Sequence, residues 1–487
     1  MIPILMMLSL QQSPPQLTRL DSLMQRISAQ VPYLAFGVTV VRADQVLHLR
    51  TYGNDTSGQP LTAQSPFYIA SSTKSFTALV AAILADRRQI DLDAPISRYV
   101  PGFTLPAPLD ASRVTLRRLL SHRGGFESGP VGTRTAFTGN LTTDSMLPLL
   151  MRTAMPVDTG FRYTNTQFIL AARVMELVTG TPWQDLVARE ILRPLGMTRS
   201  TARLSEAAAW PAAQGYGPGP EGTRPIGQKS DAIMHAAGGM VMSTSDAARW
   251  LRFQLGKGRL DGRQIIPERI VMATRAQASS QRDSFETIDR FGYGLGWQIG
   301  MWHGDTLLHH FGNYPGAFAH VSFMPAHGVG VAVFQNSEMP AHGRIAGLIA
   351  RYAYDLVIGG DPARLAAAER EVDSLASRTA RMATIFRNDW ARRAARGTTP
   401  PRGWAPYAGS YVNSDWGTLE IIAFHDSARL RFGVVETPIQ LFQGDDIRLE
   451  MTAGRTSGVV ARPTFGDDGR VTQLSVDGLV FTASRPR

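Results

Sequence analysis

The spacing of apolar residues predicts strands near the beginning of the chain, helices in its middle and strands again towards residue 335. Residues 36–53 alternate apolar and polar positions around Ala43-Asp44, which predicts a hairpin of two strands. Residues 71–87 carry apolar side chains at helical spacing. The same patterns predict helices at 114–121, 166–179, 183–194, 244–255 and 342–357, and strands at 291–300, 318–324 and 329–335. This order favours an α+β region at 31–360 in which an antiparallel sheet gathers both ends.

The pattern changes after Gly359-Gly360. Asp361-Pro362 is a favourable cap and first turn for a helix, and apolar residues then fall on one face as far as Met382. The other face of this predicted helix is charged, so we expect the apolar face to pack against the main body. Residues 361–403 are interpreted as a helical connector that ends in a linker at 397–403. Residues 404–487 contain short alternating strands and turn pairs, which predicts a small all-β domain such as a barrel.

The first ten residues, Met1 to Leu10, are nearly all apolar. This pattern resembles the end of a signal peptide, although the first basic residue is Arg19. We favour export to the periplasm or the cell exterior; the alternative is a cytoplasmic protein with a short hydrophobic tail. Residues 1–30 are interpreted as this apolar signal remnant followed by a first helix. No later run reaches about 18 uninterrupted apolar residues, so we predict no membrane span.

The composition narrows the classes of function. The chain is 44% apolar and 18% charged, which is ordinary for a globular protein. Its net charge is +10, but no basic run stands out, and this disfavours nucleic acid as a partner. The absence of cysteine excludes disulfides, thiol catalysis and cysteine metal sites.

Lysine is rare, and its rarity points to one position. Only three of the 50 basic residues are lysines, namely Lys74, Lys229 and Lys257. Arginine stays protonated in proteins, whereas a buried lysine can lose its proton and act as a base. Lys74 is therefore a candidate for chemistry. Lys229 and Lys257 lie in polar segments flanked by glycine, and we interpret them as lysines without a chemical role.

Ser71 and Lys74 form an S-x-x-K motif at the predicted start of the 71–87 helix. Side chains three residues apart share a helix face, so we expect the two to be neighbours. A serine hydroxyl needs a base to become an effective nucleophile, and a desolvated lysine can have a pKa low enough to supply one. The free amides of the helix N-terminus would favour negative charge there. The alternative interpretation is a capping serine beside a solvated lysine.

Tyr163 and Asn165 precede the predicted helix at 166–179. Residues i and i+2 of an extended segment point the same way, so we expect the phenol and the amide to face one pocket. Tyr163 would relay a proton if a nearby cation lowered its pKa. Asn165 would donate to a substrate carbonyl and orient the lysine amine. Alone this Y-x-N triplet is weak, because it also occurs at Tyr52 and Tyr411.

A third triplet, His310-Phe311-Gly312, follows a short apolar run and leads into a predicted strand. Gly312 would let the backbone approach a ligand closely. The backbone amides of Asn313 and Ser71 are together candidates for an oxyanion hole. H-x-G also occurs at His122, so this triplet too is weak alone.

The order S-x-x-K, Y-x-N and H-x-G resembles that of the serine β-lactamase and penicillin-binding protein superfamily, on the class C side, which includes peptidase family S12 and family VIII-like esterases. The resemblance spans roughly residues 30–355, and residues 405–432 further resemble the lipocalin-like β domain attached to some members. Other segments that match landmarks of this superfamily are Phe67 to Thr77, Leu119 to Phe126, Pro194 to Met197, Ala236 to Asp246, Tyr293 to Trp297 and His310 to Gly316.

The resemblance implies a fold and a set of site residues. The fold is an antiparallel sheet flanked by helices, with an all-helical lobe, followed by a small C-terminal β-barrel. Neither a metal nor an organic cofactor is expected. The implied roles are acylated nucleophile for Ser71, proton partners for Lys74 and Tyr163, substrate binding for Asn165, His310 and Gly312, and oxyanion binding for the amides of Ser71 and Asn313.

Two positions depart from the pattern of this superfamily. Dedicated β-lactamases of this type usually carry Lys-Thr-Gly where the chain has His310-Phe311-Gly312. A histidine is largely neutral near pH 7, so it lowers a phenol pKa and holds a substrate carboxylate less well than lysine. The second departure is Gly124, where relatives commonly carry serine; the sequence offers no chemical reason for it.

The sequence therefore favours a serine hydrolase that acts through an acyl-enzyme on a carboxylic ester or a small peptide-like amide. The alternatives within the enzymes are a D-aminopeptidase or D,D-carboxypeptidase, followed by a β-lactamase. The alternative of another class is a sensor or binding module that reuses the fold without turnover. The loops around the cleft set the substrate pocket, so the sequence does not choose among the substrates, and it leaves the oligomeric state open.

Overall fold

The computed structural model describes residues 15–158, 160–227, 229–452 and 458–484. The apolar segment from Met1 to Leu10 lies outside the described residues, and so does its interpretation as a signal remnant. Within the described part of the chain, no helix has both the length and the apolar character that crossing a membrane requires.

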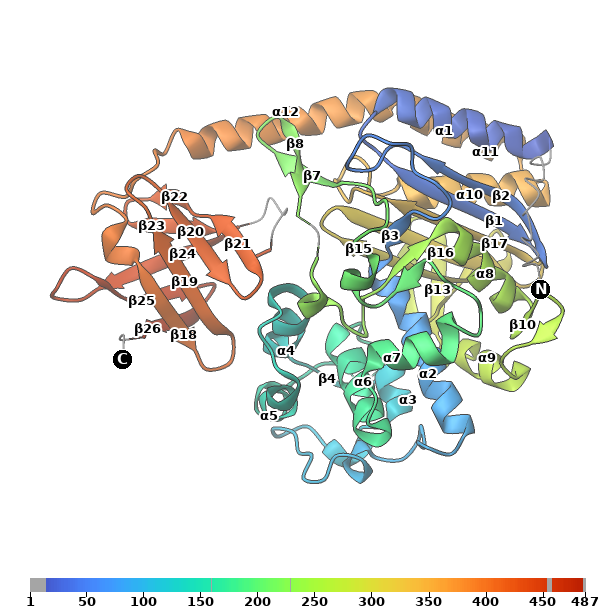
Figure 1. Cartoon of the computed structure of the whole chain (residues 1–487), viewed down its shortest axis with the longest axis horizontal. Helices are drawn as coiled ribbons and strands as arrows, with labels where there is room; N and C mark the ends of the chain where they lie inside the picture. The colour runs from blue at the N-terminus through green and yellow to red at the C-terminus, as the bar shows by residue number, and fades with distance from the viewer. Residues whose placement is uncertain (1–14, 159, 228, 453–457, 485–487) are drawn as a thin grey trace, which may run out of the picture.

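Eight antiparallel strands form the central sheet, in the order β12-β13-β14-β15-β16-β17-β1-β2 (Figure 1). The first strand, β1, pairs with both β2 and β17, so the sheet joins the two ends of the region and the α+β prediction is confirmed. The strands are β1 Phe36–Arg42, β2 Gln45–Tyr52, β12 Ser279–Phe285, β13 Ile288–Tyr293, β14 Gln298–Trp302, β15 Asp305–Tyr314, β16 Ala317–Met324 and β17 Val329–Gln335.

Apolar clusters cover both faces of this sheet. Along β17, Val331 and Val333 belong to one cluster, and Ala332 and Phe334 belong to the other. Because both faces are buried, β16 and β17 are continuous apolar runs rather than alternating ones. The helices are α1 Thr18–Gln30, α10 Ile345–Ile358 and α11 Pro362–Asp373 on the first face, and α2 Lys74–Asp86, α8 Thr244–Leu255 and α9 Glu268–Arg275 on the second.

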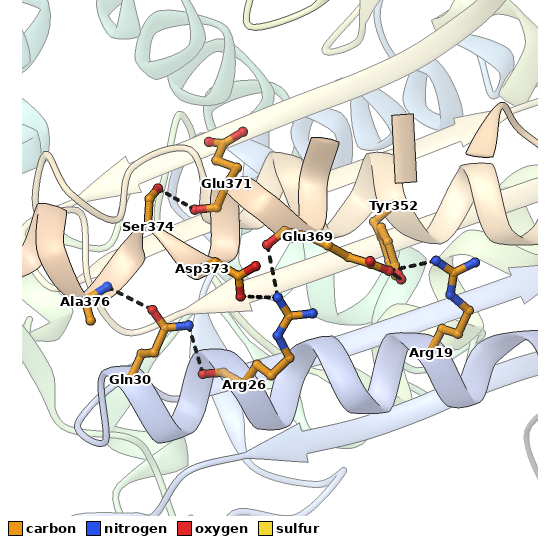
Figure 2. Close-up of polar contacts among 9 residues, drawn as sticks. All are labelled: Arg19, Arg26, Gln30, Tyr352, Glu369, Glu371, Asp373, Ser374 and Ala376. Atoms are coloured by element: carbon orange, nitrogen blue, oxygen red, sulfur yellow. Dashed lines mark hydrogen bonds and ion pairs between the residues drawn. The ribbon is translucent and has the colours of Figure 1, made fainter. Parts of the chain in front are cut away.

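Polar contacts connect the first helix, α1, to α11 and to the residues that follow it (Figure 2). Arg19 Nη2 lies 2.7 Å from Glu369 Oε1, and the Tyr352 hydroxyl donates to the same oxygen at 2.6 Å. At the other end of α1, the side-chain oxygen of Gln30 accepts from the Ala376 amide at 2.9 Å. These contacts bring the beginning of the described chain onto the same outer layer as the segment that leads to the C-terminal region.

The helical lobe surrounds α2, whose residues from Lys74 to Leu84 are all buried. Two of its helices, α4 and α5, were not among the sequence predictions. The lobe contains α3 Leu116–Leu120, α4 Gly129–Thr133, α5 Thr143–Thr153, α6 Asn165–Thr179 and α7 Trp183–Val187. The remaining short strands outside the central sheet and the C-terminal region are β3 Pro66–Tyr68, β4 Phe126–Glu127, β5 Met155–Pro156, β6 Ser200–Thr201, β7 Gly215–Gly219, β8 Gly222–Ile226, β9 Val241–Ser243, β10 Arg259–Leu260 and β11 Arg263–Gln264.

The prediction of one strand at 291–300 is wrong, because two strands, β13 and β14, meet there at a turn of residues 294–297. Gly296 has φ +76°, and a Cβ at this position would come within 2.5 Å of the Lys74 carbonyl oxygen. The turn thus packs against the start of α2, and only glycine leaves enough room between Gly296 and the Lys74 carbonyl. The apolar alternation ran through the turn, so periodicity alone did not reveal it.

The prediction of one helix from residue 361 to 382 is also wrong. Helix α11 ends at Asp373, and α12 spans Leu375–Ala394. At the break, the Ser374 hydroxyl donates to the Glu371 carbonyl at 2.8 Å. Serine competes in this way with the regular backbone pattern, while the apolar stripe continues through the buried Leu375.

Helix α12 leads to nine antiparallel strands that form a nearly closed barrel, as predicted (Figure 1). The barrel has its own apolar cluster. It contacts the helical lobe, where Arg152 Nε lies 2.8 Å from Asp415 Oδ1 and the Val434 amide donates to the Thr138 carbonyl at 2.8 Å. Its strands are β18 Gly409–Asn413, β19 Gly417–Ala423, β20 Ala428–Phe432, β21 Val435–Pro438, β22 Gln440–Gln443, β23 Asp446–Leu449, β24 Val459–Phe465, β25 Val471–Val476 and β26 Leu479–Ala483.

Candidate active site

Ser71 lies in a single 3₁₀ turn, η2, that spans Ala70–Thr73 and leads directly into α2. Ala70, immediately before it, has φ 42°, which is the left-handed region that residues with a Cβ seldom occupy. Such backbone strain costs of order 1–3 kcal/mol and tends to occur at functional sites. The turn brings Lys74 Nζ to 3.1 Å from Ser71 Oγ, as the S-x-x-K spacing predicts.

Lys74 is fully buried, and its amine has two further partners. Its Nζ lies 2.9 Å from Asn165 Oδ1 and 2.7 Å from the Ala237 carbonyl oxygen. Burial lowers the pKa of Lys74 well below its usual value, and no carboxylate of the described residues counteracts this. A neutral amine has two N–H groups and one lone pair. In the neutral form, the two carbonyl oxygens would accept hydrogen bonds from the N–H groups, which would leave the lone pair for the Ser71 hydroxyl proton.

Tyr163 covers this amine, with Lys74 Nζ 4.7 Å from the centre of its ring. The residue is 38% exposed, but its phenol group is enclosed, and this burial raises the pKa of Tyr163. A hydrogen bond with Ser71 and the charge of Arg290 act weakly in the opposite direction. The expectation of a phenol pKa lowered by a neighbouring cation is therefore wrong, because burial of the phenol outweighs the charge of Arg290. The phenol is a proton donor at rest.

His310 lies on β15 and is 2% exposed. Its Nδ1–H donates to the Phe311 carbonyl at 2.8 Å, so its Nε2 is the acceptor for the Tyr293 hydroxyl at 3.3 Å. Burial, followed by the electrostatic effect of Lys74, lowers the pKa of His310 to about 3, so the ring is neutral. The rings of His310 and Tyr163 lie 6.1 Å apart. Its role in substrate binding stays a prediction.

The edge of β15 beyond His309 is not paired with β14 and faces η2 instead. Ser72 Oγ donates to the His310 carbonyl at 3.2 Å and fastens the turn to the strand. A Cβ at Gly312 would come within 2.1 Å of the Ile69 carbonyl oxygen and 2.9 Å of the Ser71 nitrogen. The close approach that Gly312 permits is thus to η2, and Asn313 is the next residue along the strand. The oxyanion role of the two amides stays a prediction.

The family model described as Beta-lactamase matches residues 20–354. The chain belongs to the β-lactamase family of serine hydrolases. The resemblance drawn from the three motifs is confirmed, and the match covers the central sheet and the helical lobe.

Curated relatives in this family carry different names. Penicillin-binding protein 4 of Amycolatopsis lactamdurans is 28% identical over 331 residues, which are 65% of this chain and 84% of that protein. An unguisins hydrolase of Aspergillus campestris is 27% identical over 293 residues, 57% of this chain but only 53% of that protein. The chain therefore spans about half of the second relative.

Solved structures share the fold. A penicillin-binding protein homologue from Pyrococcus abyssi, described as octameric, has a TM-score of 0.62 at 21% identity and covers 96% of this chain and 99% of its own. The D-amino acid amidase of Ochrobactrum anthropi, complexed with D-phenylalanine, has a TM-score of 0.55 at 21% identity and covers 69% of this chain and 98% of its own. The first likeness extends over nearly the whole chain, so it includes the C-terminal region.

The Y-x-N and H-x-G triplets also occur at Tyr52, Tyr411 and His122, and the structure shows where each of these residues lies. The Tyr52 hydroxyl donates to Asp21, and the Tyr411 hydroxyl lies inside the barrel, where it donates to Tyr407. His122, in contrast, lies in the site, with its ring 4.4 Å from that of Tyr163 and 4.9 Å from that of Tyr293. His122 is thus part of the aromatic wall behind the phenol.

Gly124, which departs from the family pattern, now has a structural reason. Its amide donates to Gln167 Oε1 at 3.1 Å. A Cβ at position 124 would come within 2.9 Å of Gln167 Cδ, so any larger residue would displace that amide. Gln167 is fully buried on α6, two residues after Asn165.

Sequence reasoning missed three groups in the site. Tyr293 is the partner of His310, and the Ala237 carbonyl is a partner of Lys74; both lie in segments that carry the family resemblance, without a side-chain signal for these roles. Lys229 was interpreted as a lysine without a chemical role, which stays a prediction, but its amine lies between two tyrosines. Its Nζ lies 2.7 Å from the Tyr68 hydroxyl and 4.0 Å from the centre of the Tyr314 ring. The only sequence signal that could have pointed to Lys229 was the rarity of lysine in this chain.

Proposed function

We propose that the chain hydrolyses a carboxylic ester or a small peptide-like amide through an acyl-enzyme on Ser71. The observation that carries the proposal is the buried amine of Lys74, 3.1 Å from Ser71 Oγ, with both of its N–H groups directed at carbonyl oxygens. A serine that only capped a helix would have no need of a desolvated base.

In the proposed reaction, Lys74 takes the Ser71 proton as Oγ attacks the substrate carbonyl carbon. The amides of Ser71 and Asn313 hold the oxyanion. Tyr163 donates its phenol proton to the leaving group and recovers a proton from Lys74, so the charges of both residues are restored. Water then attacks the acyl-enzyme by the reverse proton path, and Ser71 leaves with its proton.

The neutral state of His310 supports an ester or uncharged amide over a β-lactam. Members of the family that are dedicated β-lactamases usually carry a lysine there, which would hold the substrate carboxylate. With a pKa of about 3, His310 carries no charge at neutral pH to hold that group.

Amide substrates are the second candidate within this proposal. The fold likeness to a D-amino acid amidase, and to the crystal structure of SurE with D-Leu at a TM-score of 0.53 and 19% identity, favours testing small D-configured acyl groups. These likenesses concern the fold, so they favour a substrate panel rather than one substrate.

The test compares kcat/KM for short-chain 4-nitrophenyl esters, D-alanyl peptides and a chromogenic cephalosporin. We expect the highest value for an ester or a small amide, and a loss of at least about a thousandfold in Ser71→Ala. Ser75→Ala is the matched control, because this buried hydroxyl lies one turn further on and donates only to the Ser72 carbonyl. Absence of turnover on the whole panel would favour the sensor or binding module instead.

A further inference from the structure

A cavity of about 210 Å³ has Lys229 in its wall. Its wall is mainly apolar and aromatic, from β3, the segment after β6, and the end of β15. The wall includes Tyr68, Leu204, Trp210, Lys229, Tyr314 and Pro315. Tyr68 precedes Ser71 by three residues, and Tyr314 directly follows Asn313. The Tyr68 hydroxyl also donates to the Gly238 carbonyl, next to the Ala237 carbonyl that accepts from Lys74, which connects the cavity wall to the proposed catalytic residues.

Lys229 is held between two tyrosines at this cavity. Its Nζ lies 4.6 Å from the centre of the Tyr68 ring and 4.0 Å from that of Tyr314. It donates to the Tyr68 hydroxyl at 2.7 Å, and that hydroxyl donates in turn to the Gly238 carbonyl. Among the described residues, no carboxylate pairs with Lys229; burial alone shifts its pKa, to about 7. An amine with three donors thus has N–H capacity left for a ligand.

The direction of β15 assigns this cavity to the acyl side of the substrate. The leaving group must lie beside its proton donor, Tyr163, whose ring is 6.1 Å from that of His310. Tyr314 lies four residues further along the strand, which is about 13 Å at the usual rise of about 3.3 Å per residue. With the scissile carbonyl at Asn313, the acyl part extends away from His310 and towards Lys229.

We propose that Lys229 binds a carboxylate carried at the far end of the substrate's acyl part, with the apolar body of that part in the cavity beside Trp210 and Leu204. The inference rests on the proposed function and names the substrate class. Acyl groups with a free ammonium should be poor substrates, because their charge and that of Lys229 would then share a poorly solvated cavity. N-acylated or dicarboxylic acyl groups fit, whereas free D-amino acid amides fit less well.

The probes are mono(4-nitrophenyl) esters of adipic, pimelic and suberic acids. Each is compared with the ester in which the free carboxylate is replaced by a neutral amide of the same shape, the ω-amide. The measured quantity is the ratio of kcat/KM for the acid to that for the amide. We expect a ratio of at least about ten at pH 6 for one chain length, since only the acid can form a charge-assisted hydrogen bond with Lys229. Lys229→Met should lower this ratio at least fivefold, and Lys229→Arg should keep most of it. Lys257→Met is the control, because Lys257 is exposed and pairs with Glu268.

The pH dependence of the ratio in the unmodified protein is a second readout that needs no variant. Lys229 is charged below its pKa, so the ratio should fall as pH rises from 6 to 9. The titratable groups around Lys229 are Tyr68, Tyr314 and His235. Burial raises the pKa of Tyr68 well above its usual value and lowers that of His235 well below it, so neither changes charge in this range.

The outcomes separate this inference from the proposed function. Turnover of the ω-amides that depends on Ser71, together with a ratio near one in the unmodified protein, would overturn the role of Lys229 alone. A ratio that is high but unchanged in a folded Lys229→Met variant, or independent of pH, would also overturn it. Absence of turnover of both esters in every pair would overturn the proposed function.

Discussion

The Ala237 carbonyl oxygen lies 2.7 Å from Lys74 Nζ, closer than the Ser71 hydroxyl, which lies at 3.1 Å. Together with Asn165 Oδ1, it occupies the N–H groups of the neutral amine. The backbone of the segment after η8, Asp231–Ile233, therefore aims the lysine lone pair at the nucleophile. The proton-transfer geometry depends on a residue with no functional side chain.

Lys74→Arg tests whether a base is needed at this position. Arginine keeps the positive charge but stays protonated, so it cannot accept the Ser71 proton. We expect kcat/KM for a 4-nitrophenyl ester to fall by about 10²–10⁴. Lys257→Arg makes the same change at an exposed ion pair with Glu268 and should behave like the unmodified protein. Turnover within a few-fold of normal in Lys74→Arg would rule out the lysine as base.

Asn165→Asp tests the protonation state of Lys74 through the pH profile. A carboxylate 2.9 Å from Nζ would favour the charged amine and raise its pKa, by about 1–3 units for an opposite charge at this range. Because the neutral amine is the active form, activity is lost as pH falls through this pKa. The acidic limb of kcat/KM should therefore move to higher pH. Asn54→Asp, at an exposed position, is the control; an unmoved acidic limb in Asn165→Asp would contradict the assignment.

Sequence reasoning located the proposed nucleophile, base and phenol because each belongs to a local motif, and the structure brings Ser71, Lys74, Tyr163 and Asn165 together. It gave the wrong direction for the Tyr163 pKa, since that pKa is raised by burial of the phenol, which no local pattern reports. It dismissed Lys229 for a similar reason. The polar, glycine-flanked segment looks exposed, yet two tyrosines distant in sequence enclose its amine.

The helices and strands were likewise predicted where the local sequence pattern determines them. The 36–53 hairpin and the 244–255 helix were predicted with nearly the bounds that the structure has. The breaks at Gly296 and Ser374 were missed, because the apolar pattern continues across both. Gly296 is required by its approach to the Lys74 carbonyl, which is a tertiary contact.

Gly312→Ala tests the approach of β15 to the nucleophile turn. The new Cβ would lie within 2.1 Å of the Ile69 carbonyl oxygen, so the strand must move away from η2. We expect a loss of about 1–3 kcal/mol in the free energy of unfolding, as for overpacking, and a fall in kcat of at least about tenfold. Gly343→Ala is the control, because its nearest neighbour to a new Cβ is 3.8 Å away. Normal kcat in Gly312→Ala would show that this spacing does not matter.

His310→Lys tests why the chain departs from dedicated β-lactamases of its family. A lysine there would add a cation that can hold a substrate carboxylate beside Tyr163. We expect the kcat/KM for a cephalosporin, relative to that for a neutral ester, to rise about tenfold, the equivalent of about 1.4 kcal/mol. His310→Gln keeps a neutral hydrogen-bonding group and should give no such rise. An equal rise in both variants would mean that charge is not the cause.

The position of covalent attachment tests the account most directly. The protein is treated with a fluorophosphonate, digested, and the modified residue is identified by tandem mass spectrometry, with the rate of labelling followed in parallel. We expect one phosphonate on Ser71, no labelling in Ser71→Ala, and labelling slowed by at least about a hundredfold in Lys74→Arg. Attachment at another residue, or an unchanged rate in Lys74→Arg, would contradict a nucleophile activated by a neutral buried lysine.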